Sequence, residues 1–426
     1  MIKSTLFILS VFGTLFSQII SFDTIPETLH FYARDTANMA KIVVKGSVSE
    51  TGHAKVSLLL SCNGTALDTA EAALTYGSSG AAFRLAQDIR CGLYEYSIKI
   101  LLDGTEVAKA DSIVCGDVIL INGQSNSVSD GQLGVPNEFI RTYELPLRAW
   151  TYGSEGVWPH RVGERIIREH NVPVAIMSGG ASSTGIVSHV PGSNHYDSLL
   201  KRVILGGVQH NVKMLFWYQG ENDTRTLTET KAYPGYFDIL YKAWIKDYPG
   251  IEKIYICQIN MWFKDLPGYE NTSCEFREYQ RTLANTYDKL EVIATVGTAS
   301  EYGGHYGTKG YRKLGDRIYP LVSSDFYEQQ KVPGVSSPNI KRAYYSTAAR
   351  DEITLLFDQP VYWQDADTAG HKMKDYFYLD TAYGMVTAGK HNLAEKSIVL
   401  TLSGTQNGKA IRYLPDGWYH EGGNVF

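Results

Sequence analysis

Two different patterns of hydrophobic and polar positions follow one another along the chain. Up to residue 112, short runs alternate between apolar and polar side chains and are separated by turn residues, as in residues 41–46, 55–60 and 94–102. This alternation is typical of strands with one buried face, and Asp103-Gly104 between two such runs predicts a hairpin turn. We therefore predict a small β-sandwich over residues 18–112.

The pattern then changes to continuous apolar runs with segments of helical period between them. The apolar runs are residues 118–121, 172–177, 214–218, 254–259 and 290–296, and helical periodicity is clearest over 162–170 and 236–245. Continuous apolar strands linked by helices indicate a parallel sheet that is covered on both faces. The sequence predicts an α/β domain over residues 113–326, with ligands expected at the carboxyl ends of its strands.

Strand patterns return after a linker rich in Pro, Gly and Ser at residues 332–338. Alternating runs at residues 353–358 and 397–402 predict a second small β domain over residues 327–426. The chain stops at Phe426 without a polar tail, so we expect this domain to be truncated.

The first residues have the composition of an export signal. Residues 1–17 carry one lysine, Lys3, followed by an apolar run, and the small Ser17 precedes Gln18. This pattern predicts a signal peptide over residues 1–17. The mature protein is expected to be secreted, or to lie in a periplasm or at a cell surface.

Composition narrows the possible partners. The 40 basic and 45 acidic residues give a net charge of −5, which argues against a strongly basic nucleic-acid binder. No apolar stretch after the predicted signal peptide approaches the ~20 residues that span a bilayer. The 29 Tyr, 15 Phe and 7 Trp fit half-buried strands, but such rings also stack on sugars.

The five cysteines cannot all form pairs. Strand-like runs beside Cys62 and Cys91 make a disulfide between these two plausible, whereas Cys257 inside an apolar run is expected to be a buried free thiol. No CxxC spacing occurs, which disfavours a zinc site.

A candidate nucleophile follows the first apolar run of the α/β domain. The run ends at Asn122, Gly123 permits a tight turn, and Ser125 stands where a following helix would begin. This places a hydroxyl at the carboxyl edge of the sheet, near backbone N–H groups that bind negative charge. The alternative is a serine that only caps a helix.

Other polar residues follow neighbouring runs and should reach the same edge. Gln219, Glu221, Asn222 and Asp223 come after the third run, and His305 comes after the fifth. The loop after the second run, residues 178–185, is small and polar, as a loop of backbone N–H donors must be. A serine, a histidine base, an amide donor and such a loop are the set that acyl transfer requires.

Three of these segments together resemble the sequence blocks of SGNH hydrolases. They are Gly123-Gln-Ser-Asn126, Trp217-Tyr-Gln-Gly-Glu221, and His305 with the downstream Gly310-Tyr-Arg-Lys-Leu-Gly315. The sequence is most similar to the sialate O-acetylesterase-like branch of the carbohydrate esterases. The resemblance implies a three-layer α/β/α, flavodoxin-like catalytic domain, flanked here by two small β-sandwich domains.

The resemblance also implies roles for individual residues. Ser125 would be the nucleophile and His305 the general base, with the amide of Gln219 donating to the oxyanion beside the backbone N–H of Ser125. The reaction would be hydrolysis of a carboxylic ester through an acetyl-enzyme, with no metal and no organic cofactor.

The sequence departs from the family pattern at two places. Where the family has Gly-Gly-Thr after the second strand, this chain has Ser182 and Ser183 before a threonine, and the family's aspartate three residues before the histidine is Tyr302. Three possibilities for orienting the histidine stay open: Glu221, Glu301, or a Ser-His dyad without an acid.

Further residues are candidates for contact with substrate. They are Asn126, Asn222, Asp223, His189 and Tyr302, with Tyr218, Tyr302 and Tyr306 placed where stacking on sugar is conceivable. For His189, structural or surface roles are about equally compatible with the sequence.

Two functions remain at this point. The first is an exported esterase that removes O-acetyl groups from sialic acid or an acetylated polysaccharide. The second is a glycan-binding protein with a degenerate, inactive α/β domain, favoured by Tyr302, Ser182 and Ser183. The sequence does not predict the particular glycan or the oligomeric state.

Overall fold

The structure is a computed structural model of the 426-residue chain. It describes residues 19–128, 137–153, 157–260, 272–298, 305–328, 330, 332–366 and 370–414, so the signal peptide predicted over residues 1–17 lies outside it. The chain forms two compact units. The first comprises Met1–Thr28, Lys41–Ile89 and Glu95–Ser112, and the second comprises Leu29–Ala40, Arg90–Tyr94 and Ile113–Phe426.

The first unit is a β-sandwich, as the alternating pattern predicts. Its strands are β1 (Ile20–Thr24), β3 (Met39–Val48), β4 (Lys55–Cys62), β5 (Thr65–Ala73), β6 (Ala81–Arg90), β7 (Tyr96–Leu102) and the first half of β8 (Thr105–Gly123). One sheet has the order β1-β3-β6, and in the other β4 pairs with β5 and β7, and β7 with β8. Buried and accessible residues alternate along β6 and β7, so each sheet has one face toward the core. The predicted hairpin turn is confirmed by Asp103 and Gly104, with φ of 48° and 89°.

The second unit contains the predicted parallel sheet. From Ile113 onward every residue of β8 is buried, because this half of the strand lies inside the sheet. The order is β10-β9-β11-β8-β12-β13-β14, and all neighbouring pairs are parallel except β10 with β9. The further strands are β2 (Phe31–Ala33), β9 (Ile140–Glu144), β10 (Ala149–Tyr152), β11 (Val174–Ser178), β12 (Val212–Tyr218), β13 (Lys253–Gln258) and β14 (Leu290–Ala294).

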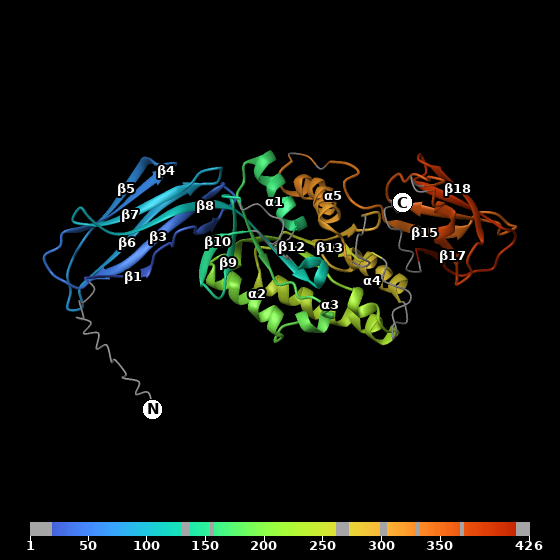
Figure 1. Ribbon diagram of the computed structural model, residues 1–426, viewed down its shortest axis with the longest axis horizontal. Coiled ribbons are helices and arrows are strands. Elements are labelled where there is room, and N and C mark those ends of the chain that lie inside the picture. Colours follow the sequence, from blue (N-terminus) through green and yellow to red (C-terminus); the bar gives the residue numbers. More distant parts are fainter. Residues whose placement is uncertain are drawn as a thin grey trace, which may run out of the picture. The chain divides into compact units, whose positions relative to one another are not determined.

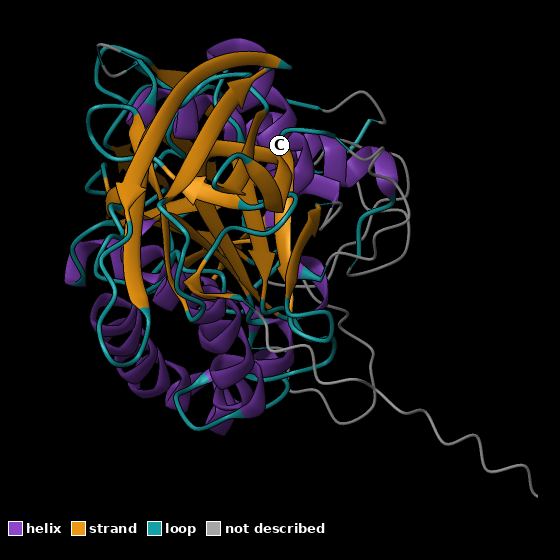
Figure 2. Cartoon of the chain, turned by 90° about the vertical axis from the view of Figure 1, so that its left-hand side faces the viewer, coloured by secondary structure: helices purple, strands orange, loops and turns teal. Residues whose placement is uncertain are grey.

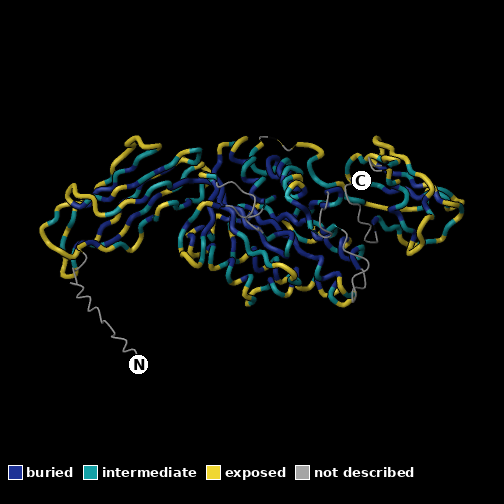
Figure 3. The backbone as a smooth tube through the Cα atoms, in the orientation of Figure 1, coloured by how far each residue is buried: buried dark blue, intermediate teal, exposed yellow. Residues whose placement is uncertain are grey.

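Helices cover both faces of this sheet, which completes the expected α/β/α layering (Figures 1 and 2). The helices are α1 (Val157–His170), α2 (Asn194–Leu205), α3 (Leu227–Asp247), α4 (Ser273–Thr286) and α5 (Thr308–Phe326). Helices α1 and α5 lie on one face, and α2, α3 and α4 on the other (Figure 1). The strands between them form the most deeply buried part of the unit (Figure 3).

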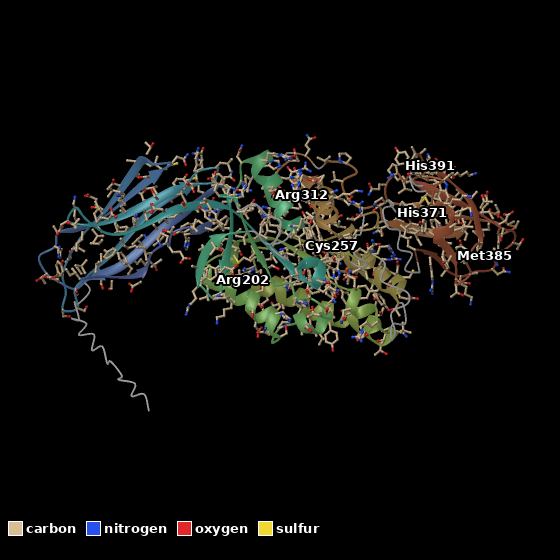
Figure 4. The ribbon with its side chains drawn as sticks, viewed as in Figure 1. Arg202, Cys257, Arg312, His371, Met385 and His391 are labelled. Atoms are coloured by element: carbon tan, nitrogen blue, oxygen red, sulfur yellow. The ribbon has the colours of Figure 1, made fainter. Side chains whose placement is uncertain are left out.

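The β9–β10 hairpin at the sheet edge was not predicted from the sequence. Its first strand carries Arg141, a charged residue that is fully buried. Arg202 of α2 (Figure 4) fastens this edge, because its guanidinium donates to the carbonyls of Tyr143 at 2.8 Å and Ser178 at 2.5 Å. Because buried polar residues interrupt the first strand, it does not form an apolar run, and the hydrophobic pattern does not predict the hairpin.

A buried ion-pair cluster lies at the amino-terminal end of the sheet portion of β8. Asp117 accepts from Arg34 at 2.8 and 2.7 Å, from Lys213 at 3.1 Å and from the hydroxyl of Tyr327 at 2.8 Å. Burial alone would raise the pKa of Asp117, but the bonds to Arg34 and the charges of Lys213 and Arg34 outweigh it and hold that pKa below its usual range. The cluster therefore joins β8 to the segment after β2, to β12 and to the residues after α5.

The last part of the chain, within the second unit, forms the expected strands. Its strands are β15 (Ile340–Tyr345), β16 (Glu352–Phe357), β17 (Phe377–Leu379), β18 (Val386–Asn392), β19 (Ser397–Leu402) and β20 (Ile411–Tyr413). They form a four-stranded sheet, β15-β16-β19-β18, and a two-stranded sheet, β17-β20. His371, Met385 and His391 mark this part of the chain in Figure 4.

The cysteines differ from the expectation in one respect. All five are free thiols, so the predicted bridge between Cys62 and Cys91 is wrong. Cys62 ends β4, where it pairs with Tyr96, whereas Cys91 belongs to the other unit and hydrogen-bonds to Cys115. Cys257 is confirmed as a buried free thiol, in β13 (Figure 4).

No helix among the described residues has the length and apolar composition that crossing a membrane would require.

Candidate active site

Ser125 lies in a tight turn at the carboxyl end of β8, the central strand of the parallel sheet. The strand ends at Gly123, whose φ of 138° lies in a region that side-chain-bearing residues rarely adopt. A Cβ atom there would lie 2.0 Å from the carbonyl oxygen of Tyr218 in the neighbouring strand β12. The turn continues into a short 3-10 helix, Ser125–Ser127, in which Ser125 is half-buried between buried neighbours.

His305 reaches this serine from the other side of the chain. Its Nε2 atom lies 2.7 Å from Oγ of Ser125, which is a hydrogen bond of the length required between a nucleophile and its base. The histidine stands three residues before α5, and the residue after it, Tyr306, bonds through its hydroxyl to that of Tyr218 at 3.0 Å. The structure thus brings together the two residues that the sequence predicts as nucleophile and base.

The segment after β12 is joined to the turn of Ser125 through Gln124. The side-chain oxygen of Gln124 accepts the backbone N–H groups of Gly220 and Asn222, each at 3.1 Å. It also lies 3.3 Å from Nε2 of Gln219. Gln124 therefore organises the start of the short helix Glu221–Thr224 against the nucleophile turn.

Gln219 is fully buried, and its amide nitrogen faces protein acceptors. Besides Gln124, Nε2 donates to a carboxylate oxygen of Asp223 and lies 3.3 Å from the carbonyl oxygen of Thr184. Its two hydrogens thus face three acceptors, while Oε1 is buried with no partner among the described residues. To act as the predicted oxyanion donor, Gln219 would have to release one of these acceptors.

Asp223 is a buried carboxylate that holds two segments of the site together. The same oxygen that accepts from Gln219 accepts the backbone N–H of Ile186 at 3.0 Å. Burial raises the pKa of Asp223 to about 6. Asp223, which the sequence predicts as a substrate contact, is thus hydrogen-bonded to the loop after β11. Asn222 beside it is half-buried.

Glu221 does not contact His305. Its Oε1 atom accepts from Nδ2 of Asn126 at 2.7 Å, and Oε2 is buried with no partner among the described residues. Only 2% of Glu221 is exposed, and this burial raises its pKa to about 7. The structure places Glu221 beside the residue that follows the nucleophile, although the sequence interpretation had considered it as the acid that orients the histidine.

Asn126 has two more anchors. The hydroxyl of Tyr311 in α5 donates to its Oδ1 at 2.8 Å, and the indole N–H of Trp158 in α1 donates to its backbone carbonyl at 2.9 Å. Asn126 itself is 2% exposed. The sequence predicts that Asn126 contacts substrate, whereas in the structure its side chain is hydrogen-bonded to Glu221 and Tyr311.

The loop after β11 lies against the nucleophile turn through its backbone. The N–H of Ala181 donates to the carbonyl of Gly123 at 2.9 Å. Ser182 and Ser183 at its tip are exposed, and Ser183 has a φ of 59°, a left-handed conformation that fits the glycine found in the related family pattern. The bond from Ala181 therefore holds this loop beside the end of β8, where the turn of Ser125 begins.

His189 has a structural role in this loop. It is completely buried, its Nε2 lies 2.8 Å from the hydroxyl of Thr184, and its ring meets the edge of Trp217. Burial lowers the pKa of His189 to about 3, so the imidazole is neutral. The alternative that His189 contacts substrate is not supported by this position.

The aromatic candidates for sugar stacking are not accessible. Tyr218 is 0% and Tyr306 3% exposed, and their hydroxyls bond to each other. Tyr302 and Glu301 lie outside the described residues. Sequence reasoning did not single out Gln124, Trp158 and Tyr311 as parts of the site. The position of Gln124 directly before Ser125 is the feature of the sequence that could have indicated its role in the site.

Within the described part of the chain, no group of three or more His, Cys, Asp or Glu side chains could hold a metal ion.

Residues 153–322 match the family described as "Carbohydrate esterase, sialic acid-specific acetylesterase". This segment contains Gln219, Glu221 and His305 and begins after Ser125. No match was found among curated proteins.

Solved structures that align with this chain include a carbohydrate acetylesterase from Xanthomonas citri. It aligns with a TM-score of 0.63 and 17% sequence identity, over 92% of this chain and 95% of that one. A protein from Arabidopsis thaliana aligns with a TM-score of 0.43 and 19% identity, over 50% of this chain and 99% of that one. A carbohydrate acetylesterase from Sinorhizobium meliloti aligns with a TM-score of 0.33 and 15% identity, over 49% of this chain and 100% of that one. The first alignment confirms the predicted fold. The family match agrees with the resemblance seen in the two motifs that it covers, around Gln219 and His305.

Proposed function

We propose that this protein is a serine esterase that removes O-acetyl groups from carbohydrate, since residues 153–322 match the family of sialic acid-specific acetylesterases among the carbohydrate esterases. The observation that carries this proposal is the 2.7 Å contact between His305 Nε2 and Ser125 Oγ at the carboxyl edge of the sheet. A nucleophile hydrogen-bonded to a base is the minimum apparatus for acyl transfer.

The proposed reaction has two steps. In the first, His305 takes the proton of Ser125 while Oγ attacks the acetyl carbonyl, and the sugar hydroxyl leaves with a proton returned by the histidine. In the second, His305 takes a proton from water, whose oxygen attacks the acetyl-enzyme. Acetate leaves as the bond to Oγ breaks, and His305 returns the proton to Oγ of Ser125. No metal or organic cofactor takes part in this scheme.

The negative oxygen of each tetrahedral intermediate needs hydrogen-bond donors. The backbone N–H of Ser125 donates to no acceptor among the described residues, which leaves it available for this purpose. We assign further donors to the backbone of the loop that carries Ser182 and Ser183. Gln219 then serves mainly to hold that loop, through Asp223 and Thr184.

We propose that His305 is oriented by Glu301 or that the enzyme works as a Ser-His dyad. Glu221 is not assigned this role, because its carboxylate is hydrogen-bonded to Asn126. A Ser-His dyad remains a working catalyst, because an orienting acid raises the rate but is not strictly required.

We further propose that the protein is exported and acts on acetylated carbohydrate outside the cytoplasm. The composition of residues 1–17 supports this, and removal after Ser17 would leave Gln18 as the first residue. Mass spectrometry of the amino-terminal peptide from protein made in a secreting host tests the cleavage. Sialic acid and polysaccharides are both compatible substrates, and acetate release from a panel of acetylated glycans distinguishes them.

The test of the esterase proposal is hydrolysis of 4-nitrophenyl acetate by the wild type, Ser125→Ala and Ser198→Ala. Ser198 in α2 is a matched control for loss of a serine hydroxyl. We expect Ser125→Ala to lose at least about 10³-fold in kcat and Ser198→Ala to keep wild-type activity. A wild type without activity that still binds glycans would favour the alternative, a glycan-binding protein with an inactive α/β domain.

A further inference from the structure

Both residues that flank Ser125 send their side chains across to the segment that follows β12. Gln124 accepts two backbone N–H groups of that segment, and Asn126 donates in the opposite direction to Glu221 at 2.7 Å. Tyr311 holds the other end of the Asn126 amide at 2.8 Å. The nucleophile thus stands between two residues that are each fixed by side-chain hydrogen bonds from other elements.

From this arrangement we propose that Glu221 and Tyr311 are positioning residues, which act through Asn126 to direct the hydroxyl of Ser125 toward His305. The inference deepens the proposed function, because it rests on Ser125 being the nucleophile. It replaces the interpretation of Glu221 as the acid that orients the histidine.

The local backbone explains why such a clamp is needed. The serine lies in a 3-10 helix of only three residues, Ser125–Ser127, which is too short to fix its own orientation. Tyr311 lies in the first turn of α5, and His305 lies three residues before that helix. A hydrogen bond from Tyr311 to Asn126 therefore sets the position of the nucleophile relative to the element that follows its base.

The cost of burying Glu221 supports a functional role. A carboxylate that is 2% exposed and has one oxygen without a partner among the described residues destabilises the fold, and an apolar residue would avoid that cost. The side-chain hydrogen bond that this buried carboxylate makes is the one it accepts from Asn126. Removing the carboxylate takes away the acceptor of Nδ2 in Asn126, next to the nucleophile, and a misplacement of about 1 Å costs on the order of 10²-fold in rate.

The experiment measures kcat and KM with 4-nitrophenyl acetate, together with the rate at which a sulfonyl fluoride modifies the active serine. The variants are Glu221→Ala, Glu221→Gln and Tyr311→Phe. The control is Tyr319→Phe, which removes a hydroxyl on the same helix that bonds to Glu169 rather than to Asn126.

We expect Glu221→Ala to lower kcat and the modification rate by on the order of 10²-fold, with KM changed less than about 2-fold. Glu221→Gln should restore most of both rates, because the amide oxygen still accepts from Asn126. Tyr311→Phe should fall between, and Tyr319→Phe should match the wild type. A purely structural role would lower Tm without this split between kcat and KM.

Wild-type rates in both Glu221→Ala and Tyr311→Phe would overturn the inference, and so would equal losses in Glu221→Ala and Glu221→Gln. If Glu221→Ala does not fold, Tyr311→Phe alone decides. Failure of the proposed function looks different, because the wild type would then not hydrolyse the ester or Ser125→Ala would keep activity. The modification rate still reports the position of Ser125 in that case.

Discussion

The buried carboxylate of Glu221 makes the stability of the α/β domain depend on pH in a direction that can be calculated. Burial raises its pKa from 4.5 to about 7, so between these values the folded protein holds a proton that the unfolded chain has lost. Stability contributed by this proton is present at pH 4.5 and is lost as pH rises toward 7. Over this interval, at about 1.4 kcal/mol per pH unit, the loss amounts to about 3 kcal/mol.

Glu221→Gln removes the titration and keeps the size and the acceptor for Asn126. We expect the free energy of unfolding of the wild type, relative to this variant, to fall by about 3 kcal/mol between pH 4.5 and pH 8. Urea unfolding followed by tryptophan fluorescence measures it, because Trp158, Trp217 and Trp244 are buried in this domain. Glu278→Gln, which removes a carboxylate that is 57% exposed, controls for the loss of one surface charge.

A difference between wild type and Glu221→Gln that stays constant from pH 4.5 to pH 8 would refute the reasoning. So would a difference that changes in the opposite direction, which would mean that the ionised form of Glu221 is the one stabilised by folding.

Two further predictions concern the scaffold beneath the site. Gly123→Ala should lower the free energy of unfolding by more than about 2 kcal/mol, because φ is 138° and the new Cβ would meet the carbonyl of Tyr218 at 2.0 Å; a Tm equal to that of the wild type would contradict this. Asp117→Asn should lower the free energy of unfolding by about 3 kcal/mol at neutral pH, because it removes the buried carboxylate that pairs with Arg34 and Lys213. Since the pKa of Asp117 is held below its usual range, this difference should shrink in urea unfolding as pH falls into the acid range, and a difference independent of pH would count against it.

The sequence predicted the parts of the site that depend on topology. Ser125 and His305 follow strands of one parallel sheet, and the carboxyl ends of such strands meet at one edge, so their proximity could be expected before any coordinates. The motif at residues 217–221 follows another strand of this sheet, so Gln219 could be expected at the same edge. These predictions needed only the order of strands and the positions of residues just beyond them.

Side-chain direction was not predictable in the same way. Glu221 reaches the expected edge, but whether its carboxylate meets His305 or Asn126 depends on packing between β12 and the nucleophile turn. Tyr218 and Tyr306 also lie at this edge, where both are buried and their hydroxyls bond to each other. Periodicity along the chain holds no information about such contacts across it.

Covalent capture of Ser125 tests the central claim most directly. The protein is incubated with a sulfonyl fluoride or with 4-nitrophenyl acetate at low pH, digested, and the modified peptide is identified by mass spectrometry. We predict a single adduct on Ser125, formed slowly in His305→Ala and absent in Ser125→Ala. An adduct on another residue, or an equal rate of modification without His305, would contradict the assignment of Ser125 as nucleophile and His305 as its base.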